Sequence, residues 1–178
     1  VVLDYRCEYR GETAFNVREI GLALQVPQRL SDVWWHRMAD WSAYPEGHIG
    51  RPRGYARSAP APANPLKPAG RWEDDTTEQG TNDYRACKRS ILAGGATDGK
   101  LAVSLLSDGS QHLRMTVVNG HPVMHALDWY GGVPFRNDTD HIWTATFGTG
   151  KRIDYRTTLQ GQTVLMAGAL PAAALGKV

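Results

Sequence analysis

Residues 101–121 read LAVSLLSDGSQHLRMTVVNGH, and this stretch decides the fold class. Apolar residues alternate with others in two runs, at Leu101, Val103 and Leu105 and again at Leu113, Met115 and Val117. Alternation with a period of two puts the apolar side chains on one face of an extended strand. Asp-Gly at 108–109 and Asn-Gly at 119–120 follow the two runs, and these dipeptides favour tight turns. The stretch therefore predicts half-buried strands joined by short turns.

The same pattern continues on both sides of this stretch. In the N-terminal part it occupies Leu3, Tyr5, Cys7 and Tyr9, and then Ile20, Leu22, Leu24 and Val26. Further candidate strands are the ranges 32–37, 123–130, 141–147 and 162–169. No segment keeps an apolar stripe of helical period, with caps, for more than about two turns. We therefore predict an all-β chain folded as an antiparallel β-sandwich.

Length and composition are those of an ordinary folded domain. The chain has 178 residues, of which 42% are hydrophobic and 21% charged, and a chain of this size can be stable without a metal or a cofactor. We predict one domain over residues 1–178 with no cofactor. Lys and Arg number 20 against 18 Asp and Glu, and the basic residues are scattered, so nucleic acid is not predicted as a partner. No run of 18 apolar residues occurs, so no membrane partner is predicted either.

The start of the chain and its two cysteines lead to further expectations. The sequence begins at Val1 without a methionine and enters a strand pattern at once, so we expect a domain cut from a longer protein. Cys7 and Cys87 do not have the CxxC spacing of a zinc or redox site. Because free cysteine is among the most buried residue types, we predict that both are buried thiols.

The range 45–80 differs in composition from the rest of the chain. It holds most of the prolines, at Pro45, Pro52, Pro60, Pro62, Pro65 and Pro68. We predict a long irregular loop over 45–80 within the domain. Loops of this length in compact domains are usually functional, and aromatic residues flank this one, so we expect it to form the functional surface.

Several motifs resemble the C-terminal region of bacterial glycoside hydrolase family two proteins of the β-galactosidase type. The most specific is WSAYPEGHIGRP at 41–52. Shorter motifs of that region follow in the same order along the chain, at 81–85, 97–99, 107–114 and 127–132, and two precede it, at 18–22 and 34–37. The resemblance covers about residues 5 to 170.

The resemblance implies a large β-sandwich of the supersandwich kind, which also occurs in galactose mutarotases. In that family the domain packs near the catalytic barrel and lends residues to the rim of the sugar pocket. The two catalytic glutamates lie on the barrel, and this chain holds no Asn-Glu dipeptide of the kind that marks the first of them. The implied function is therefore a non-catalytic domain of a glycosidase. Its implied partners are the other domains of the same polypeptide and galactose-containing saccharides.

Aromatic and polar residues around the long loop are the candidate sugar-binding residues. Sugars stack their C–H faces on exposed aromatic rings, and a carboxylate with a guanidinium can hold neighbouring hydroxyls. The candidates are Trp41, Tyr44, Glu46, His48, Arg51 and Trp72. Two other interpretations stay open: the tryptophans can belong to the core, and Glu46 can pair with Arg51 to shape the loop. No catalytic residue is predicted.

Three alternative functions stay open at this point. The chain can be a free-standing carbohydrate-binding module, or a structural domain without sugar contact, which burial of Trp41 and Trp72 would favour. It can also be an enzyme of the mutarotase or epimerase type, in which a His and a Glu act as acid and base, although no spacing pairs such residues.

Two groups of residues have side chains that metals bind, but neither pattern predicts a metal site. Pro122 interrupts the pair His121 and His125, and a catalytic zinc site draws three close ligands. The run 137–140 offers oxygen ligands of the kind that calcium prefers, but it is more simply explained as a turn between strands. We predict no metal site.

Overall fold

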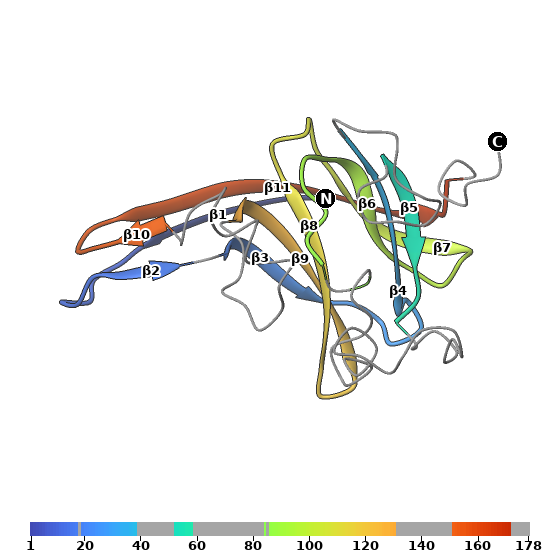
Figure 1. The fold of residues 1–178 in the computed structure, drawn as a ribbon, viewed down its shortest axis with the longest axis horizontal. Coiled ribbons are helices and arrows are strands. Elements are labelled where there is room, and N and C mark those ends of the chain that lie inside the picture. The colour runs from blue at the N-terminus through green and yellow to red at the C-terminus, as the bar shows by residue number, and fades with distance from the viewer. Residues whose placement is uncertain (18, 39–51, 59–83, 85, 131–150, 172–178) are drawn as a thin grey trace, which may run out of the picture.

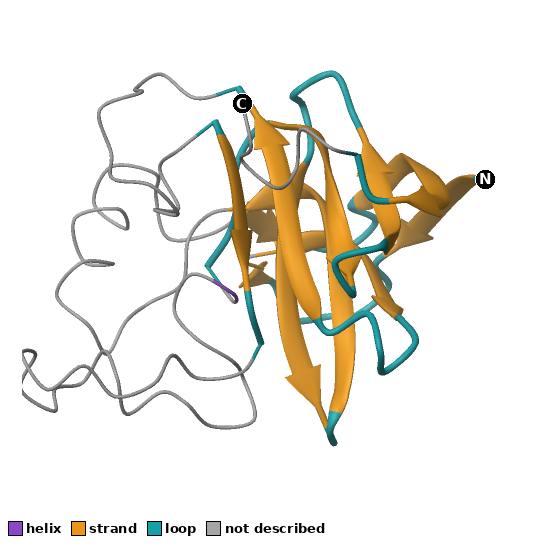
Figure 2. Ribbon diagram, turned by 90° about the vertical axis from the view of Figure 1, so that its right-hand side faces the viewer, coloured by secondary structure: helices purple, strands orange, loops and turns teal. Residues whose placement is uncertain are grey.

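The computed structural model describes residues 1–17, 19–38, 52–58, 84, 86–130 and 151–171. Each named element of this part is a β-strand, and every pair of strands is antiparallel (Figure 1). In Figure 2 the described chain is drawn almost wholly as strands joined by short loops. The predicted all-β antiparallel fold is therefore confirmed.

The larger layer is a six-stranded sheet with the order β1-β11-β7-β6-β4-β5. Its strands are β1 (Val2–Glu8), β4 (Asp32–Arg37), β5 (Arg53–Ala56), β6 (Ile91–Thr97), β7 (Leu101–Leu106) and β11 (Thr158–Ala169). The first and last strands of the described residues, β1 and β11, pair along the whole of β1. In Figure 1 these two strands extend together toward the small two-stranded sheet of β2 (Phe15–Val17) and β10 (Lys151–Ile153).

The second layer is a three-stranded sheet of β3 (Glu19–Gln25), β9 (His121–Tyr130) and β8 (His112–Val118). Its hairpin between β8 and β9 turns at Asn119-Gly120, where both residues have positive φ (51° and 76°). This is the backbone that the Asn-Gly sequence predicts. The turn at 107–110 behaves differently, because it connects β7 of the six-stranded sheet to β8 of the three-stranded sheet. It therefore carries the chain from one layer of the sandwich to the other.

The main core lies between these two sheets. The six-stranded sheet contributes the buried side chains Val33, Trp35, Ala56, Ile91, Ala96 and Leu105. The three-stranded sheet contributes Leu113, Met115, Met124 and Ala126. Most of these side chains alternate along their strands, as a period of two requires. Burial of one face of each sheet against the other is what makes the fold a sandwich.

The adjacent residues Trp34 and Trp35 face opposite sides of the six-stranded sheet. Trp35 is fully buried in the main core, whereas Trp34 packs on the outer face with Tyr55, Ala93, Ala102 and Leu170. Neither of these two tryptophans is an exposed platform, since Trp34 is only 3% exposed. They stabilise the fold by burying large apolar surfaces on both sides of β4.

The two cysteines are free thiols, and the prediction that both are buried is wrong for Cys7. Cys7 is exposed because it lies near the end of the edge strand β1, whereas Leu3 and Tyr5 on the same side of this strand are half-buried. The Cys87 side chain is half-buried. Burial raises the pKa of its thiol to about 12, so this thiol stays protonated at neutral pH.

A polar network around Asp128 ties the two layers together. The Tyr5 hydroxyl donates to Asp128 Oδ2 (2.6 Å), and Gln111 Nε2 donates to Asp128 Oδ1 (2.8 Å) and to the Gln162 carbonyl oxygen (3.0 Å). The network joins β1 and β11 of one sheet to β9 of the other. Burial and the neighbouring carboxylate raise the pKa of Tyr5 well above its usual range. Tyr5 therefore stays a hydrogen-bond donor at neutral pH.

Asp128→Asn is expected to lower the free energy of unfolding by about 1 to 3 kcal/mol. The amide nitrogen of the asparagine would face either the Tyr5 hydroxyl or Gln111 Nε2, and that donor would lose its acceptor. Urea denaturation at pH 7 measures the change. Asp4→Asn is the matched control, since Asp4 Oδ1 accepts one exposed hydrogen bond from Gln162, and its cost is expected to stay within about 0.5 kcal/mol. An equal cost for the two variants would contradict a stabilising role for the network.

Candidate functional site

The candidate sugar-binding residues of the sequence analysis all lie outside the described residues: Trp41, Tyr44, Glu46, His48, Arg51 and Trp72. The structure therefore neither brings them together nor separates them. The acidic run 137–140 lies outside the described part as well. Of the range 45–80, the described residues 52–58 include β5, which pairs with β4.

Two other groups of polar side chains can serve as sites in the described part of the chain. The first lies on the outer face of the six-stranded sheet and is called the outer-face pocket. It is an open pocket of about 600 Å³ lined by Asp32, Tyr55, Arg57, Asp98 and Gly99. Strand pairing explains how residues so distant in sequence meet: β4 lies between β5 and β6, and Asp32 is directly opposite Thr97.

The Asp32 carboxylate is held in place by three donors. The Tyr55 hydroxyl donates to Oδ2 (2.5 Å), and the Ser58 amide (3.2 Å) and the Ser31 hydroxyl (3.4 Å) donate to Oδ1. Burial and the bond to Asp32 raise the pKa of Tyr55 well above its usual range, so the phenol keeps its proton at neutral pH. Asp32 and Tyr55 thus form a rigid wall of the pocket.

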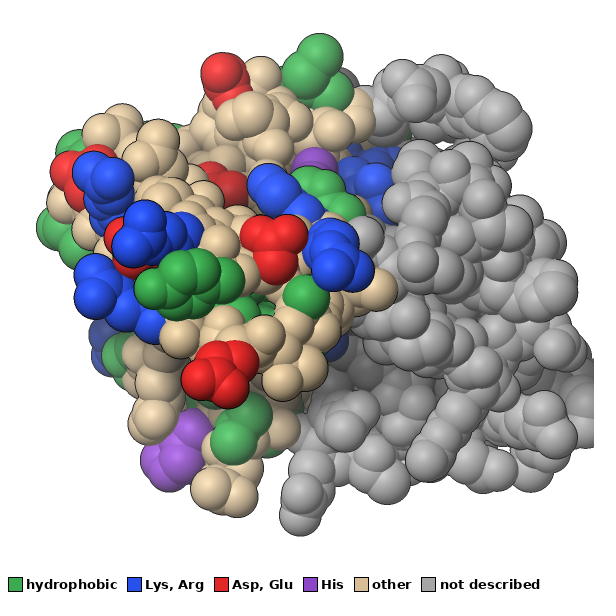
Figure 3. All heavy atoms as spheres, turned by 90° about the vertical axis from the view of Figure 1, so that its left-hand side faces the viewer, with side chains coloured by type: hydrophobic (Ala, Val, Ile, Leu, Met, Phe, Trp, Pro, Cys, Tyr) green, Lys and Arg blue, Asp and Glu red, His purple; other side chains and the backbone are tan. Residues whose placement is uncertain are grey.

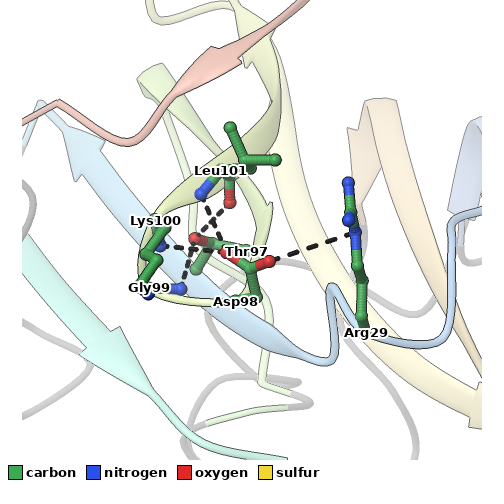
Figure 4. Close-up of polar contacts among 6 residues, drawn as sticks. All are labelled: Arg29, Thr97, Asp98, Gly99, Lys100 and Leu101. Atoms are coloured by element: carbon green, nitrogen blue, oxygen red, sulfur yellow. Dashed lines mark hydrogen bonds and ion pairs between the residues drawn. The ribbon is translucent and has the colours of Figure 1, made fainter.

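The Asp98 carboxylate is oriented by the backbone of the turn between β6 and β7 (Figure 4). Its Oδ1 accepts hydrogen bonds from the amides of Lys100 (2.9 Å) and Leu101 (2.8 Å), and its Oδ2 lies 4.0 Å from Nε of Arg29. These backbone bonds hold the pKa of Asp98 below its usual range. Gly99 has a φ of 86°, which a glycine adopts without strain. The turn therefore presents an ionised carboxylate in a fixed position.

The second group is on the outer face of the three-stranded sheet and is called the Glu19 cluster, comprising Glu19, Arg114, Thr116 and His125. Glu19 Oε2 lies 2.9 Å from Nη2 of Arg114 and 3.9 Å from Nδ1 of His125. The other ring nitrogen of His125, Nε2, lies 2.8 Å from the Thr116 hydroxyl. Arg114 and His125 are direct cross-strand neighbours of β8 and β9. A carboxylate, a guanidinium and an imidazole thus share one surface, each side chain about one-fifth exposed.

Burial, with a smaller contribution from Arg114, lowers the pKa of His125 from 6.5 to about 4. His125 is therefore neutral at pH 7. When the pH falls from about 6.5 to about 4, the unfolded chain takes up this proton before the folded one, so the fold loses stability across that window. Below pH 4 this contribution stops changing.

His125→Gln is expected to flatten the acid limb of the stability profile, because it removes a group that opposes folding by up to about 3 kcal/mol once it is protonated. Urea denaturation between pH 7 and pH 4 measures the slope. His121→Gln is the matched control, because His121 is an exposed histidine on the same strand. Identical slopes for wild type and His125→Gln would contradict the environment described for His125.

The sequence alone predicts neither group. The Glu19 cluster forms because β3 and β8 pair with β9 in a particular register. Glu19 and His125 are far apart in the chain, so the sequence does not show that they meet. One feature of the sequence does point to the Glu19 cluster: Arg114, Thr116 and His125 occupy the polar positions of two strands that the alternation predicts. Asp98 is part of an Asp-Gly turn that the sequence does predict, but its proximity to Asp32 comes from the pairing of β4 with β6.

The described residues contain no cluster of metal ligands. Among them, no group of three or more His, Cys, Asp and Glu side chains is close enough to hold an ion. The described part also has no helix with the length and hydropathy needed to span a membrane. On the face drawn in Figure 3, basic and acidic side chains lie next to one another.

Comparison with known proteins finds no match: no family model, no curated protein and no solved structure resembles this chain closely enough to be reported.

Proposed function

We propose that the chain is a non-catalytic C-terminal β-sandwich domain of a glycoside hydrolase of the β-galactosidase type. In this role it supports the tertiary structure of the enzyme and contributes to one wall of its sugar pocket. The observation that carries the proposal is the two-layered antiparallel sandwich, because it is the fold class that the sequence motifs imply.

The positions of those motifs in the fold support the proposal. The motif at 34–37 lies within β4 and supplies Trp35 to the core, and the motif at 107–114 forms the connection between the two layers with Leu113 buried behind it. The motif at 97–99 is the turn that carries Asp98 into the outer-face pocket. Together these motifs supply both core residues and pocket residues, as we expect of a domain with a structural and a binding role.

The DNA that precedes the coding region of this chain tests the proposal. We expect the same reading frame to continue upstream and to encode a barrel with two glutamates close enough to act as acid/base and nucleophile. Those residues would supply the bond cleavage that we do not assign to this domain. An upstream reading frame that encodes an unrelated protein, or none at all, would contradict the proposal.

A second function, of the mutarotase or epimerase type, is favoured by one specific observation. Glu19 and His125, which no sequence spacing pairs, lie 3.9 Å apart on one surface. Opening a pyranose ring requires a base to remove the proton of the O1 hydroxyl and an acid to protonate the ring oxygen, and ring closure on the other face reverses both transfers. A carboxylate and an imidazole are suitable groups for the two roles.

Two features of the Glu19 cluster make this the weaker proposal. Arg114 already occupies the carboxylate oxygen that would accept the proton, at 2.9 Å. The lowered pKa of His125 keeps the imidazole neutral at pH 7, where a neutral imidazole is a poor acid. Polarimetry of freshly dissolved α-galactose tests it: a rate that the chain raises and that Glu19→Gln abolishes would support the activity. A trace identical to that of buffer would eliminate it.

A further inference from the structure

We infer that the outer-face pocket binds a neutral saccharide through a hydroxyl group that donates to Asp98 beside the Tyr55 side chain. This inference rests on the proposed function and makes it specific, because it assigns the sugar contact to residues that the sequence motifs around the long loop do not include. The pocket is open to solvent and has a volume of about 600 Å³.

The polar groups of the pocket are preorganised. Three donors fix Asp32, and two backbone amides fix Asp98 through its Oδ1. In the described residues, Oδ2 of Asp98 accepts no hydrogen bond, and its nearest cation is Arg29 at 4.0 Å. A carboxylate oxygen that is held in position and has lone pairs to spare can accept from a hydroxyl without a further loss of side-chain entropy.

The charges of the pocket select the class of ligand. Asp32 and Asp98 repel a phosphate or a carboxylate, since like charges across an interface oppose binding. Arg57 lines the same pocket and Arg29 lies beside Asp98, so a bare cation is disfavoured as well. A neutral ligand rich in hydroxyls can donate to the Asp98 carboxylate without bringing a charge into the pocket, and a saccharide has this chemistry.

The aromatic contribution comes from Tyr55. Its ring packs beside Trp34 on the outer face, and its hydroxyl group points to Asp32. Gly99 closes the opposite side, where an added Cβ would lie 3.8 Å from the Tyr55 hydroxyl. The phenol and the Asp98 turn thus stand next to each other, and an apolar C–H face can lie against the ring while hydroxyls meet the carboxylate.

Titration of the chain with methyl β-galactoside and with lactose, followed by ¹H–¹⁵N NMR, tests the inference. We expect saturable shifts of the amides of Gly99, Lys100 and Leu101 at concentrations up to about 50 mM, well above the dissociation constant of a weak millimolar site. Asp98→Asn keeps an oxygen acceptor for the turn but removes the charge, and it is expected to weaken binding about tenfold or more.

Asp108→Asn is a closely matched control. Asp108 occupies the same place in the Asp-Gly turn at 107–110, and its Oδ1 accepts the Ser110 amide (3.0 Å), but it does not line the pocket. Its affinity for saccharide is expected to equal that of wild type. Far-UV circular dichroism of both variants verifies that the fold is retained.

The possible results separate this inference from the proposed function. Loss of binding in Asp98→Asn with unchanged binding in Asp108→Asn supports the pocket. Equal affinity in all three proteins, or shifts confined to amides outside the pocket, overturns the inference but leaves a sugar-contacting domain in place. Absence of any shift at about 50 mM overturns the inference too, and the upstream reading frame then decides the proposed function by itself.

Discussion

Trp35→Ala is expected to lower the free energy of unfolding by about 3 to 5 kcal/mol, the cost of removing a large aromatic side chain from a packed core. Trp35 is fully buried between the two sheets. Its ring is closely packed, since a Cβ on Gly54 of the neighbouring strand would lie only 2.0 Å from Cζ2 of Trp35. Urea denaturation monitored by far-UV circular dichroism measures the loss.

Phe15→Ala is the control for Trp35→Ala. Phe15 is also an aromatic residue in a strand, but it is 44% exposed and belongs to the small β2–β10 sheet. Its replacement is expected to cost about 1 kcal/mol or less. A cost below about 1 kcal/mol for Trp35→Ala itself would contradict the position of the core between the six-stranded and three-stranded sheets.

Lys88→Ala is expected to cost about 3 kcal/mol or more, because it removes the donor from buried acceptors. The Lys88 side chain is fully buried. Its Nζ donates to the carbonyl oxygens of Tyr84 (2.9 Å) and Ala86 (2.8 Å) and lies 5.1 Å from the centre of the Trp35 ring. Its backbone pairs with Leu113 of the three-stranded sheet, whereas Trp35 belongs to the six-stranded sheet. The lysine thus links the two layers through both its main chain and its side chain.

Lys88→Met separates the two contributions of this side chain. Methionine preserves most of the buried aliphatic stem but donates no hydrogen bond, so it is expected to be less damaging than alanine and still less stable than wild type. Lys100→Met, at an exposed turn position, is the control and is expected to change stability by less than about 0.5 kcal/mol. A Lys88→Met variant as stable as wild type would contradict the importance of the hydrogen bonds.

The class of fold could be predicted from the sequence because a strand with one buried face has apolar residues at every second position. The run from Leu101 to Val117 contains two of the observed strands, and Asn119-Gly120 forms the turn expected of it. Alternation does not reveal which strands pair. The turn at 107–110 therefore looked like an ordinary hairpin in the sequence, although it joins two different sheets.

Two strands of the six-stranded sheet escaped prediction for physical reasons. β6 reads ILAGGAT, and its glycines weaken the strand signal. They are nevertheless required, since a Cβ on Gly95 would lie 2.0 Å from the carbonyl oxygen of Val103 on the neighbouring strand. β5 is short and falls within the proline-rich range 45–80, and it forms a strand through its pairing with β4. Tertiary contacts determine both elements, and local sequence does not.

The candidate sites depend even more on strand register. Asp32, Tyr55 and Asp98 share a pocket because β4 lies between β5 and β6 with a particular alignment, and a shift of one residue would turn these side chains to the other face. The Glu19 cluster depends in the same way on the alignment of β3 and β8 against β9. The sugar-binding residues that the sequence predicts lie around the long loop instead, outside the described residues.

Hydrolysis of a chromogenic galactoside is the most direct test of the central claim, that this domain completes a glycosidase without cleaving sugar itself. Three samples are compared: this chain alone, the polypeptide encoded upstream of it alone, and the two joined as one chain. The account predicts full activity for the joined protein, strongly reduced activity for the upstream polypeptide alone, and none for this chain. Cleavage by the purified chain alone, at a rate proportional to its concentration, would contradict it.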